Sequence, residues 1–281
     1  MIAILGTGLL GSGFTRALRK RGDVVHVWNR TSSRATALEV HGAKAFADAA
    51  AAVAHADRIH VTVSDDAAVD DVLAAANPAV GMSIYDHTTT STAGALARTK
   101  RFAARGITYL HAPVFMGPQN AADSTGVMMI SGDRAACATA QPILATMTGK
   151  LVDLGPRVDA AAAFKLMGNL FLMALTTGFA DMLALAKAMH VPPAEAATLF
   201  EHFNPGTSLR ARLDRMANGS YDNPSWELAM ARKDAKLIAA EAANADIALA
   251  ILPAIAARMD EVIAEGNGAK DWSVIARDFV K

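Results

Sequence analysis

Three glycines near the start of the chain constrain its fold more than any other feature. The sequence begins with an apolar run, MIAIL, and continues as GTGLLG, where Gly6, Gly8 and Gly11 have the spacing G-x-G-x-x-G. The segment SGFTRALRKRG then has the pattern of an amphipathic helix that ends at Gly22, and VVHVW follows as a second apolar run. Strand, glycine turn, helix and strand in this order predict a βαβ unit of a parallel sheet.

Each glycine of this turn meets a separate physical need. Gly6 permits the tight turn, Gly8 lets the backbone approach a pyrophosphate, and Gly11 lets the helix pack closely on the strand. The helix start at Leu9 and Leu10 offers free N–H groups and a partial positive charge to phosphates. We therefore predict that this segment binds a dinucleotide; the alternative is a purely structural glycine turn.

The end of the second predicted strand indicates which dinucleotide is bound. NAD-binding units usually have a carboxylate there, but this chain has Asn29, Arg30 and Thr31. A carboxylate would repel a 2′-phosphate, whereas a guanidinium with neutral donors would hold it, and Arg34 lies one turn further on. The prediction is NADP(H), with Arg30 as the phosphate clamp; the alternative is that Arg30 is a solvated surface residue.

Strand-like runs alternate with helical segments up to about residue 158. The runs lie at 58–64, before Asp86, at GITYLHAPV, at VMMISGD and at GKLVDLG, and they predict a doubly wound, mostly parallel α/β sheet of the Rossmann type in an N-terminal domain, residues 1–158. Ligands bind beyond the carboxyl ends of such strands. We therefore expect the loops 64–66, 87–91 and 114–120 to face the ligands, with Ser64 among the cofactor-binding residues.

Residues 159–281 have only helical patterns and predict an all-α C-terminal domain. Its first segment, 159–190, is apolar on all sides and reads as one long interdomain helix that must be buried, in part against a second subunit. A homodimer or homotetramer formed through the C-terminal helices is therefore expected. Because this apolar stretch contains Asn169 and two threonines, a membrane span is not expected.

Composition excludes several other classes of function. Lys and Arg total 27, as do Asp and Glu, so the near-zero net charge does not favour binding of nucleic acid. The single cysteine, Cys137, cannot form an internal disulfide, and we expect it to be buried and passive. With no signal-peptide pattern at the start, we expect a cytoplasmic protein, and no metal site is predicted.

Lys165 stands out within the apolar segment AAAAFKLMGNL. An ammonium group in such surroundings is costly unless it is paired or used, and Asn169 lies four residues on, on the same helix face. A lysine and an amide together can polarise a carbonyl oxygen and protonate it as hydride arrives. The alternative is a lysine whose stem covers apolar surface while its head reaches water.

Taken together, these motifs resemble the β-hydroxyacid dehydrogenase family, over nearly the whole chain. The family's GLGxMG, NRT, D-x-S-T, DAPVSGG, K-x-x-N-N and late aromatic-plus-KD motifs correspond here to GTGLLG, Asn29–Thr31, Asp86–Thr89, His111–Gly117, Lys165–Asn169, and Trp226 with Lys233-Asp234. The resemblance implies catalysis by Lys165 with Asn169, cofactor contacts from Thr89 and Lys233, Trp226 and Asp234 near the active site, and a C-terminal domain like that of 6-phosphogluconate dehydrogenase.

The chain departs from the family pattern where the substrate is expected. Phe115 and Met116 replace the Ser-Gly that precedes Gly117, and the family serine binds a substrate carboxylate. Gly168 replaces the first asparagine of the K-x-x-N-N motif. These changes remove polar anchors and predict a site that accepts a bulkier or more apolar carbonyl compound. His111 replaces an acidic residue, and we expect a packed or surface histidine there.

The leading hypothesis is therefore an NADPH-dependent reductase of aldehydes or ketones that runs reversibly on β-hydroxyacid-like alcohols. Imine reduction is a second possibility, because imine reductases share this architecture, although the retained Lys165 argues against it. A catalytically inactive dinucleotide-binding protein is a third.

Overall fold

The computed structural model describes residues 1–280, which divide into two compact units. The first is Met1–Leu170 and the second is Phe171–Lys281, so the division falls inside a long helix. The sequence-based boundary, residue 158, lies just before that helix.

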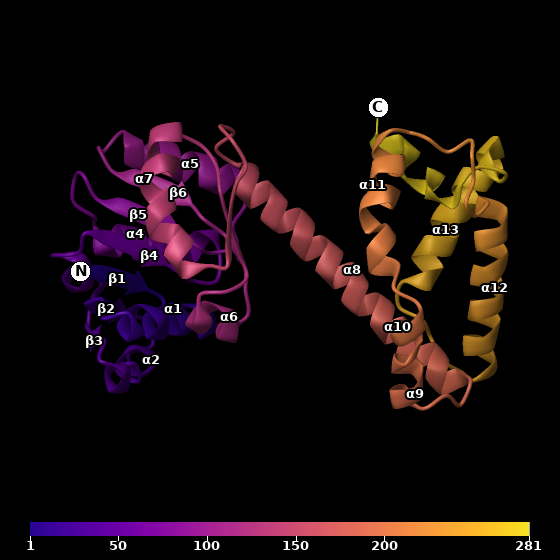
Figure 1. The fold of residues 1–281 in the computed structure, drawn as a ribbon, viewed down its shortest axis with the longest axis horizontal. Helices are drawn as coiled ribbons and strands as arrows, with labels where there is room; N and C mark the ends of the chain where they lie inside the picture. Colours follow the sequence, from indigo (N-terminus) through magenta and orange to yellow (C-terminus); the bar gives the residue numbers. More distant parts are fainter. Residues whose placement is uncertain (281) are drawn as a thin grey trace. The chain divides into compact units, whose positions relative to one another are not determined.

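A six-stranded parallel sheet forms the centre of the first unit (Figure 1). Its strands lie in the order β3-β2-β1-β4-β5-β6, which is the order of a Rossmann fold. The strands are β1 (Ile2–Leu5), β2 (Val25–Trp28), β3 (Lys44–Ala45), β4 (Arg58–Val61), β5 (Ser83–Asp86) and β6 (Thr108–His111). The connecting helices are α1 (Leu9–Lys20), α2 (Ser32–Thr36), η1 (Glu39–His41), α3 (Ala49–Val53), α4 (Asp66–Ala76) and α5 (Thr92–Ala103). The predicted doubly wound α/β fold is confirmed.

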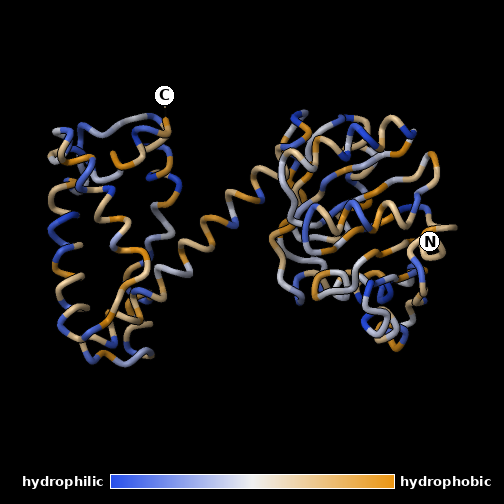
Figure 2. Tube along the Cα trace, turned by 180° about the vertical axis from the view of Figure 1, so that it is seen from behind, coloured by the Kyte–Doolittle hydropathy of each residue, from blue (hydrophilic) through white to orange (hydrophobic). Residues whose placement is uncertain are grey.

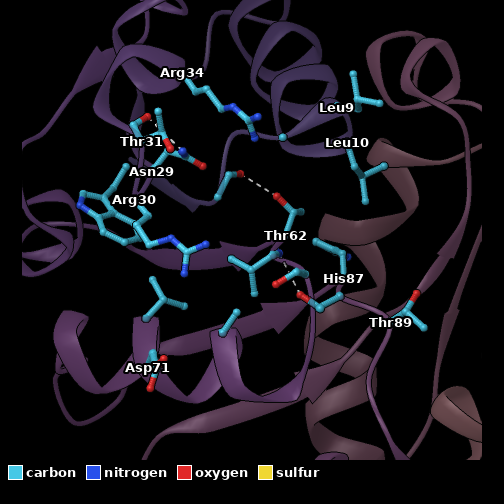
Figure 3. A pocket seen from close by; sticks show the side chains of 18 of the residues that line it. Leu9, Leu10, Asn29, Arg30, Thr31, Arg34, Thr62, Asp71, His87 and Thr89 are labelled. Atoms are coloured by element: carbon cyan, nitrogen blue, oxygen red, sulfur yellow. Dashed lines mark hydrogen bonds between the residues drawn. The ribbon is translucent and has the colours of Figure 1, made fainter.

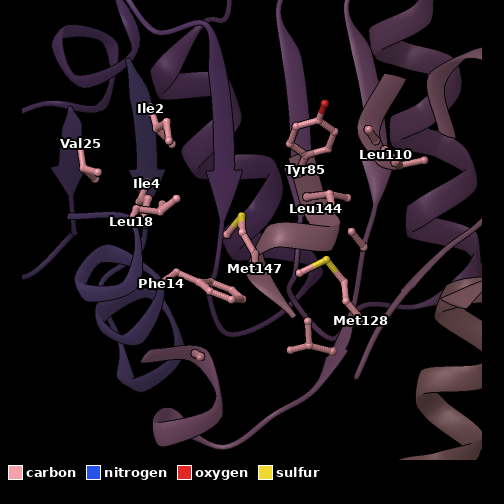
Figure 4. Close-up of a cluster of buried hydrophobic side chains, with 14 of the residues drawn as sticks. Ile2, Ile4, Phe14, Leu18, Val25, Tyr85, Leu110, Met128, Leu144 and Met147 are labelled. Atoms are coloured by element: carbon pink, nitrogen blue, oxygen red, sulfur yellow. The ribbon is translucent and has the colours of Figure 1, made fainter. Parts of the chain in front are cut away.

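Both faces of this sheet are buried, as a parallel sheet requires. In β1, Ile2 and Ile4 join one core with α1 and with α7 (Arg134–Leu144), while Ala3 and Leu5 join another core with α3, α4 and α5. Figure 4 shows Ile2, Ile4, Phe14 and Leu18 in the first of these cores. The predicted buried, unpaired state of Cys137 is also confirmed, because its thiol belongs to this core. The two cores fix the carboxyl ends of the strands on one edge of the sheet.

The last three strands form a separate sheet, in the order β7-β8-β9. The pairing of β7 (Val114–Phe115) with β8 (Val127–Ile130) is antiparallel, and that of β8 with β9 (Lys150–Asp153) is parallel. The helices of this region are α6 (Pro118–Asp123), α7 (Arg134–Leu144) and η2 (Ala145–Met147). The expectation of a single sheet was therefore wrong for these strands. The chain leaves the large sheet after β6, because the two-residue β7 pairs with β8 and not with β6.

The long apolar segment is a single helix, α8 (Ala160–Ala188). The predicted length is confirmed, but the predicted burial within the chain is wrong, since Leu170 is 69% exposed and Met173 is 66% exposed. Figure 2 shows hydrophobic residues along much of α8. By length and composition alone α8 could cross a membrane, because it has 29 residues, is largely apolar and is little buried within the described chain.

The second unit consists of helices, as predicted. These are α9 (Pro193–Ala197), α10 (Leu199–His202), η3 (Pro205–Ser208), α11 (Leu209–Ala217), α12 (Leu228–Asn244), α13 (Leu252–Val262), η4 (Ile263–Asn267) and η5 (Trp272–Phe279). Two carboxylates connect these segments through hydrogen bonds. Asp181 of α8 accepts hydrogen bonds from the backbone N–H groups of Ala250, Ile251 and Leu252, at the start of α13. Asp271 accepts from Ser225, Ser273 and Arg215; burial alone would raise its pKa, but these bonds hold it far below the usual range.

Candidate functional site

The turn between β1 and α1 is closed by two glycines that no other residue could replace without movement. Gly6 has a φ of +94°, and a β-carbon there would lie 2.2 Å from the carbonyl oxygen of Thr62. A β-carbon on Gly11 would lie 2.0 Å from the carbonyl oxygen of Gly6. The Thr62 hydroxyl donates to that same Gly6 oxygen at 2.6 Å. Strand, turn and helix are thereby locked together.

Gly8, in contrast, opens onto free space. A β-carbon built on it would meet nothing within 4 Å, and as the N-cap of α1 it offers no side chain to the first N–H groups of the helix. Beside it, the hydroxyl of Thr7 is buried and has no hydrogen-bond partner among residues 1–280. Unpaired donors at a helix N-terminus form an anion-binding site. The turn therefore has the geometry to take a pyrophosphate.

A cavity of about 760 Å³ lies above this turn, at the carboxyl ends of the strands. Its wall includes most of the residues predicted to bind the cofactor, together with Met116 and Lys165: Gly6, Gly8, Leu9, Leu10, Asn29, Arg30, Thr31, Ser64 and Thr89. Figure 3 shows Arg30, Thr31 and Arg34 at one end of the cavity, and Leu10, His87 and Thr89 at the other. Gly11 lies beneath the turn, and Phe115, Gly117 and Asn169 are not part of this wall.

The end of β2 combines a fixed amide with exposed guanidinium groups. The side-chain oxygen of Asn29 accepts from the backbone N–H of Thr7 at 3.0 Å, and its amide nitrogen donates to the carbonyl oxygen of Thr31 at 3.0 Å. Asn29 therefore braces the loop against the glycine turn, a role that the sequence did not indicate. Arg30 and Arg34 are exposed at the cavity. They can meet a phosphate without breaking existing contacts.

A chain of buried hydrogen bonds lies behind the other end of the cavity, and sequence reasoning missed it. Arg58 donates to His60, whose Nδ1 lies 2.9 Å from Nε2 of His87. Nδ1 of His87 lies 2.7 Å from the carbonyl oxygen of Ala112 and must donate to it. These contacts assign one proton to Nδ1 of each ring. The only signal in the sequence was a histidine inside each of two buried segments.

Burial keeps these rings neutral. Desolvation lowers the pKa of His87 from 6.5 to about 4, although the bond to Ala112 opposes it. Desolvation, followed by the neighbouring His87, lowers the pKa of His60 well below its usual value. His111 is also buried, with Nε2 2.9 Å from the carbonyl oxygen of Thr88, so the expected packed histidine is confirmed. The buried histidines below the cavity are thus neutral, and His60 and His87 are hydrogen-bonded to each other.

Lys165 of α8 reaches the cavity from the side of β7. Its Nζ lies 4.2 Å from the centroid of the Phe115 ring. Burial lowers the pKa of Lys165, and no neighbouring charge contributes to this shift. Asn169 follows one turn later on α8 and is partly exposed. An ammonium group with a lowered pKa and no partner can donate a proton to a bound ligand.

The remaining predicted residues lie in the second unit. Trp226 packs against Trp272 with 5.4 Å between ring centroids, and Lys233 and Asp234 on α12 form an ion pair at 3.0 Å between Nζ and Oδ1. Their assignment to the cofactor and substrate stays a prediction.

Known protein families and structures include matches to the first unit and to the fold of the chain. The family model of the NAD binding domain of 6-phosphogluconate dehydrogenase matches residues 1–155. A probable 3-hydroxyisobutyrate dehydrogenase of Mycobacterium tuberculosis is 31% identical over 192 residues, which are 67% of this chain and 64% of that protein. Glyoxylate/succinic semialdehyde reductase 2, chloroplastic, of Arabidopsis thaliana is 29% identical over 197 residues, which are 68% of this chain and 55% of that protein.

The chain thus spans less than two thirds of the length of these two relatives. Among solved structures, an imine reductase from Myxococcus stipitatus in complex with NADP+ matches with a TM-score of 0.91, covering 99% of both chains. The two sequences are 21% identical, so this likeness shows a common fold.

Proposed function

This chain belongs to the β-hydroxyacid dehydrogenase family, and from that premise we propose that it is an NADP(H)-dependent oxidoreductase. The proposed reaction transfers hydride between the nicotinamide and a carbonyl or β-hydroxyacid substrate. One observation supports it above all: the ammonium of Lys165, which forms no ion pair with any residue from 1 to 280, lines the same cavity as the glycine turn and Arg30.

The residues of the first unit fit NADP(H). The free N–H groups at Gly8–Leu10 and the unpartnered Thr7 hydroxyl suit the pyrophosphate. Arg30 and Arg34 suit a 2′-phosphate, which a carboxylate at the end of β2 would repel. Ser64 and Thr89 supply further hydroxyl groups on the cavity wall. From the second unit, we propose that Lys233 also contacts the cofactor.

The chain's own part in the reaction is the handling of one proton. NADPH, when bound, would supply the hydride. The ammonium of Lys165 holds the substrate's carbonyl oxygen and transfers a proton to it, and the resulting neutral amine takes up a proton from water. In the reverse direction the neutral amine accepts the hydroxyl proton. Desolvation favours both directions, because it brings the pKa of Lys165 closer to neutrality. We assign Asn169 to the orientation of the same oxygen.

Exchange of this one lysine tests the proposal. Lys165→Met should leave the Kd for NADPH nearly unchanged and lower kcat for aldehyde reduction by about 10²–10⁴-fold. Lys187→Met is the matched control, because Lys187 is an exposed lysine on the same helix. Turnover of Lys165→Met near that of the wild type would refute the assignment. Binding of NADPH without turnover of any carbonyl by the wild type would favour the inactive dinucleotide-binding protein.

Imine reduction is the second candidate, favoured by the apolar surroundings of Lys165. Met116 lines the cavity and Phe115 lies against Lys165; both are apolar, and neither can anchor a carboxylate. Assays of a cyclic imine and an aldehyde, each with NADPH and with NADH, separate the two candidates. Faster turnover of the imine would overturn the carbonyl assignment while retaining the oxidoreductase.

We further propose that a second copy of the chain covers α8, giving a cytoplasmic homodimer or homotetramer. The exposed apolar side chains of α8 are unfavourable in water unless another surface packs on them. A lipid bilayer is a poor partner, because the polar residues Lys165, Asn169 and Asp181 lie within the same helix. Asp181 is also committed to the start of α13. Light scattering should give at least twice the 29.3 kDa of one chain. A monomer, or one that partitions into lipid vesicles, would contradict this.

A further inference from the structure

Phe115 and Gly168 are in direct contact, although they are far apart in the sequence. Phe115 ends β7, and Gly168 lies in the first half of α8. A β-carbon on Gly168 would lie 2.2 Å from Cζ and 2.8 Å from Cε1 of the Phe115 ring, and real β-carbons essentially never approach another atom within 3.0 Å. The ring therefore occupies the space that any side chain at position 168 would need.

The same ring also lies against the proposed proton donor. Lys165 and Gly168 are three residues apart and so share one face of α8. The ammonium of Lys165 is 4.2 Å from the ring centroid, which places a cation over an aromatic face. Phe115 thus spans one helical turn, with Lys165 at one end and the bare backbone of Gly168 at the other.

Two polar side chains near this part of the cavity, His87 and Thr88, are already hydrogen-bonded within the protein. Both ring nitrogens of His87 are hydrogen-bonded, and the Thr88 hydroxyl accepts from the backbone N–H of Val63. The adjoining wall residues Val114 and Met116 are apolar. The other basic side chains of the wall, Arg30 and Arg34, belong to the far end, after β2. Within this unit, a substrate carboxylate beside Lys165 would lack a second cation.

We propose that Phe115 and Gly168 act as a paired specificity determinant of the proposed reductase. The phenyl ring, seated against the Gly168 backbone, is not among the residues that line the 760 Å³ cavity, but it adds an apolar wall beside the ammonium of Lys165. This wall selects carbonyl compounds whose substituent is uncharged and apolar over those that carry a carboxylate there. The inference rests on the proposed function for its substrate and on the Phe115–Gly168 contact for its structure.

Two aldehydes of similar length test the selection. The wild type should have a higher kcat/KM for pentanal than for succinic semialdehyde, with NADPH as the reductant. Phe115→Ser should lower the ratio of kcat/KM for pentanal to kcat/KM for succinic semialdehyde at least about tenfold. The reason is that the carboxylate of succinic semialdehyde would then face a hydroxyl group and not an apolar ring. Phe115→Leu should retain most of the ratio. A ratio unchanged in Phe115→Ser would overturn the proposal.

Thermal unfolding tests the pairing without any substrate. Alanine normally favours a helix over glycine, so Gly168→Ala should raise Tm unless the added β-carbon meets the ring. We expect Gly168→Ala to lower Tm in the wild type and to raise it in a Phe115→Ser background. Gly178→Ala is the matched control on α8, since a β-carbon there has an ordinary contact at 4.0 Å. Equal effects of Gly168→Ala in both backgrounds would refute the contact.

The two tests fail in distinguishable ways. If the wild type reduces neither aldehyde, the proposed function fails, and the pairing is still decided by Tm. If the wild type reduces both but Phe115→Ser leaves their ratio unchanged, the reductase stands and the specificity inference falls.

Discussion

Mild acid should destabilise the first unit through the buried histidines below the cavity. The pKa of His87 falls from 6.5 to about 4 on folding, chiefly by desolvation. Because the pKa of His87 is lower in the folded state, the unfolded chain binds the proton more readily. The contribution of His87 to the free energy of unfolding is therefore complete above pH 6.5 and is lost as the pH falls toward 4. Between about pH 7 and about pH 5, this one group should cost about 2 kcal/mol of unfolding free energy. His60, whose pKa is lowered in the same direction, adds to the loss.

Urea unfolding at the two pH values measures this loss. Trp28 lies in the first unit, so its fluorescence reports that unit once Trp226 and Trp272 are replaced by phenylalanine. In this background, His87→Asn should reduce the pH-dependent loss by about 2 kcal/mol, whatever its effect on stability at neutral pH. His55→Gln, at an exposed histidine, should leave the loss unchanged.

A loss of stability that is the same in His87→Asn as in the parent would refute this reasoning. It would mean that burial does not hold the His87 ring neutral in the folded protein.

Two further predictions concern the cofactor. Arg30→Ala should raise KM for NADPH about 10–100-fold and leave KM for NADH nearly unchanged, since only NADPH has a 2′-phosphate. Equal changes of the two KM values in steady-state assays would show that Arg30 does not bind the 2′-phosphate. Gly8→Ala should keep the wild-type Tm but weaken NADPH binding, whereas Gly11→Ala should also lower Tm, because only the second β-carbon meets the backbone of the turn. Equal Tm losses in the two glycine variants, measured by calorimetry, would contradict this distinction.

Local requirements explain what could be predicted from the sequence. Gly6 needs a positive φ and Gly11 a close approach, and both needs arise within one strand–turn–helix segment that the sequence displays directly. The apolar pattern of α8 likewise predicted its length, because helix periodicity is local. It could not show what covers the helix, since most of its apolar side chains have no cover within the described chain.

Contacts between distant segments explain what the sequence could not predict. His60 and His87 belong to consecutive strand regions, and their bond depends on the register of β4 against β5. Phe115 and Gly168 look like two separate departures from the family pattern, and only the structure shows that one makes room for the other. The two-residue β7 is too short to have a detectable period, so the second sheet was missed.

The pH dependence of aldehyde reduction tests most directly whether Lys165 donates the proton. Since burial lowers the pKa of Lys165 from its usual value of 10.5, kcat/KM with NADPH should fall on the alkaline side with an apparent pKa below that value. The fall should be absent from the residual activity of Lys165→Met and present in Lys187→Met. An alkaline fall that survives unchanged in Lys165→Met would contradict the assignment.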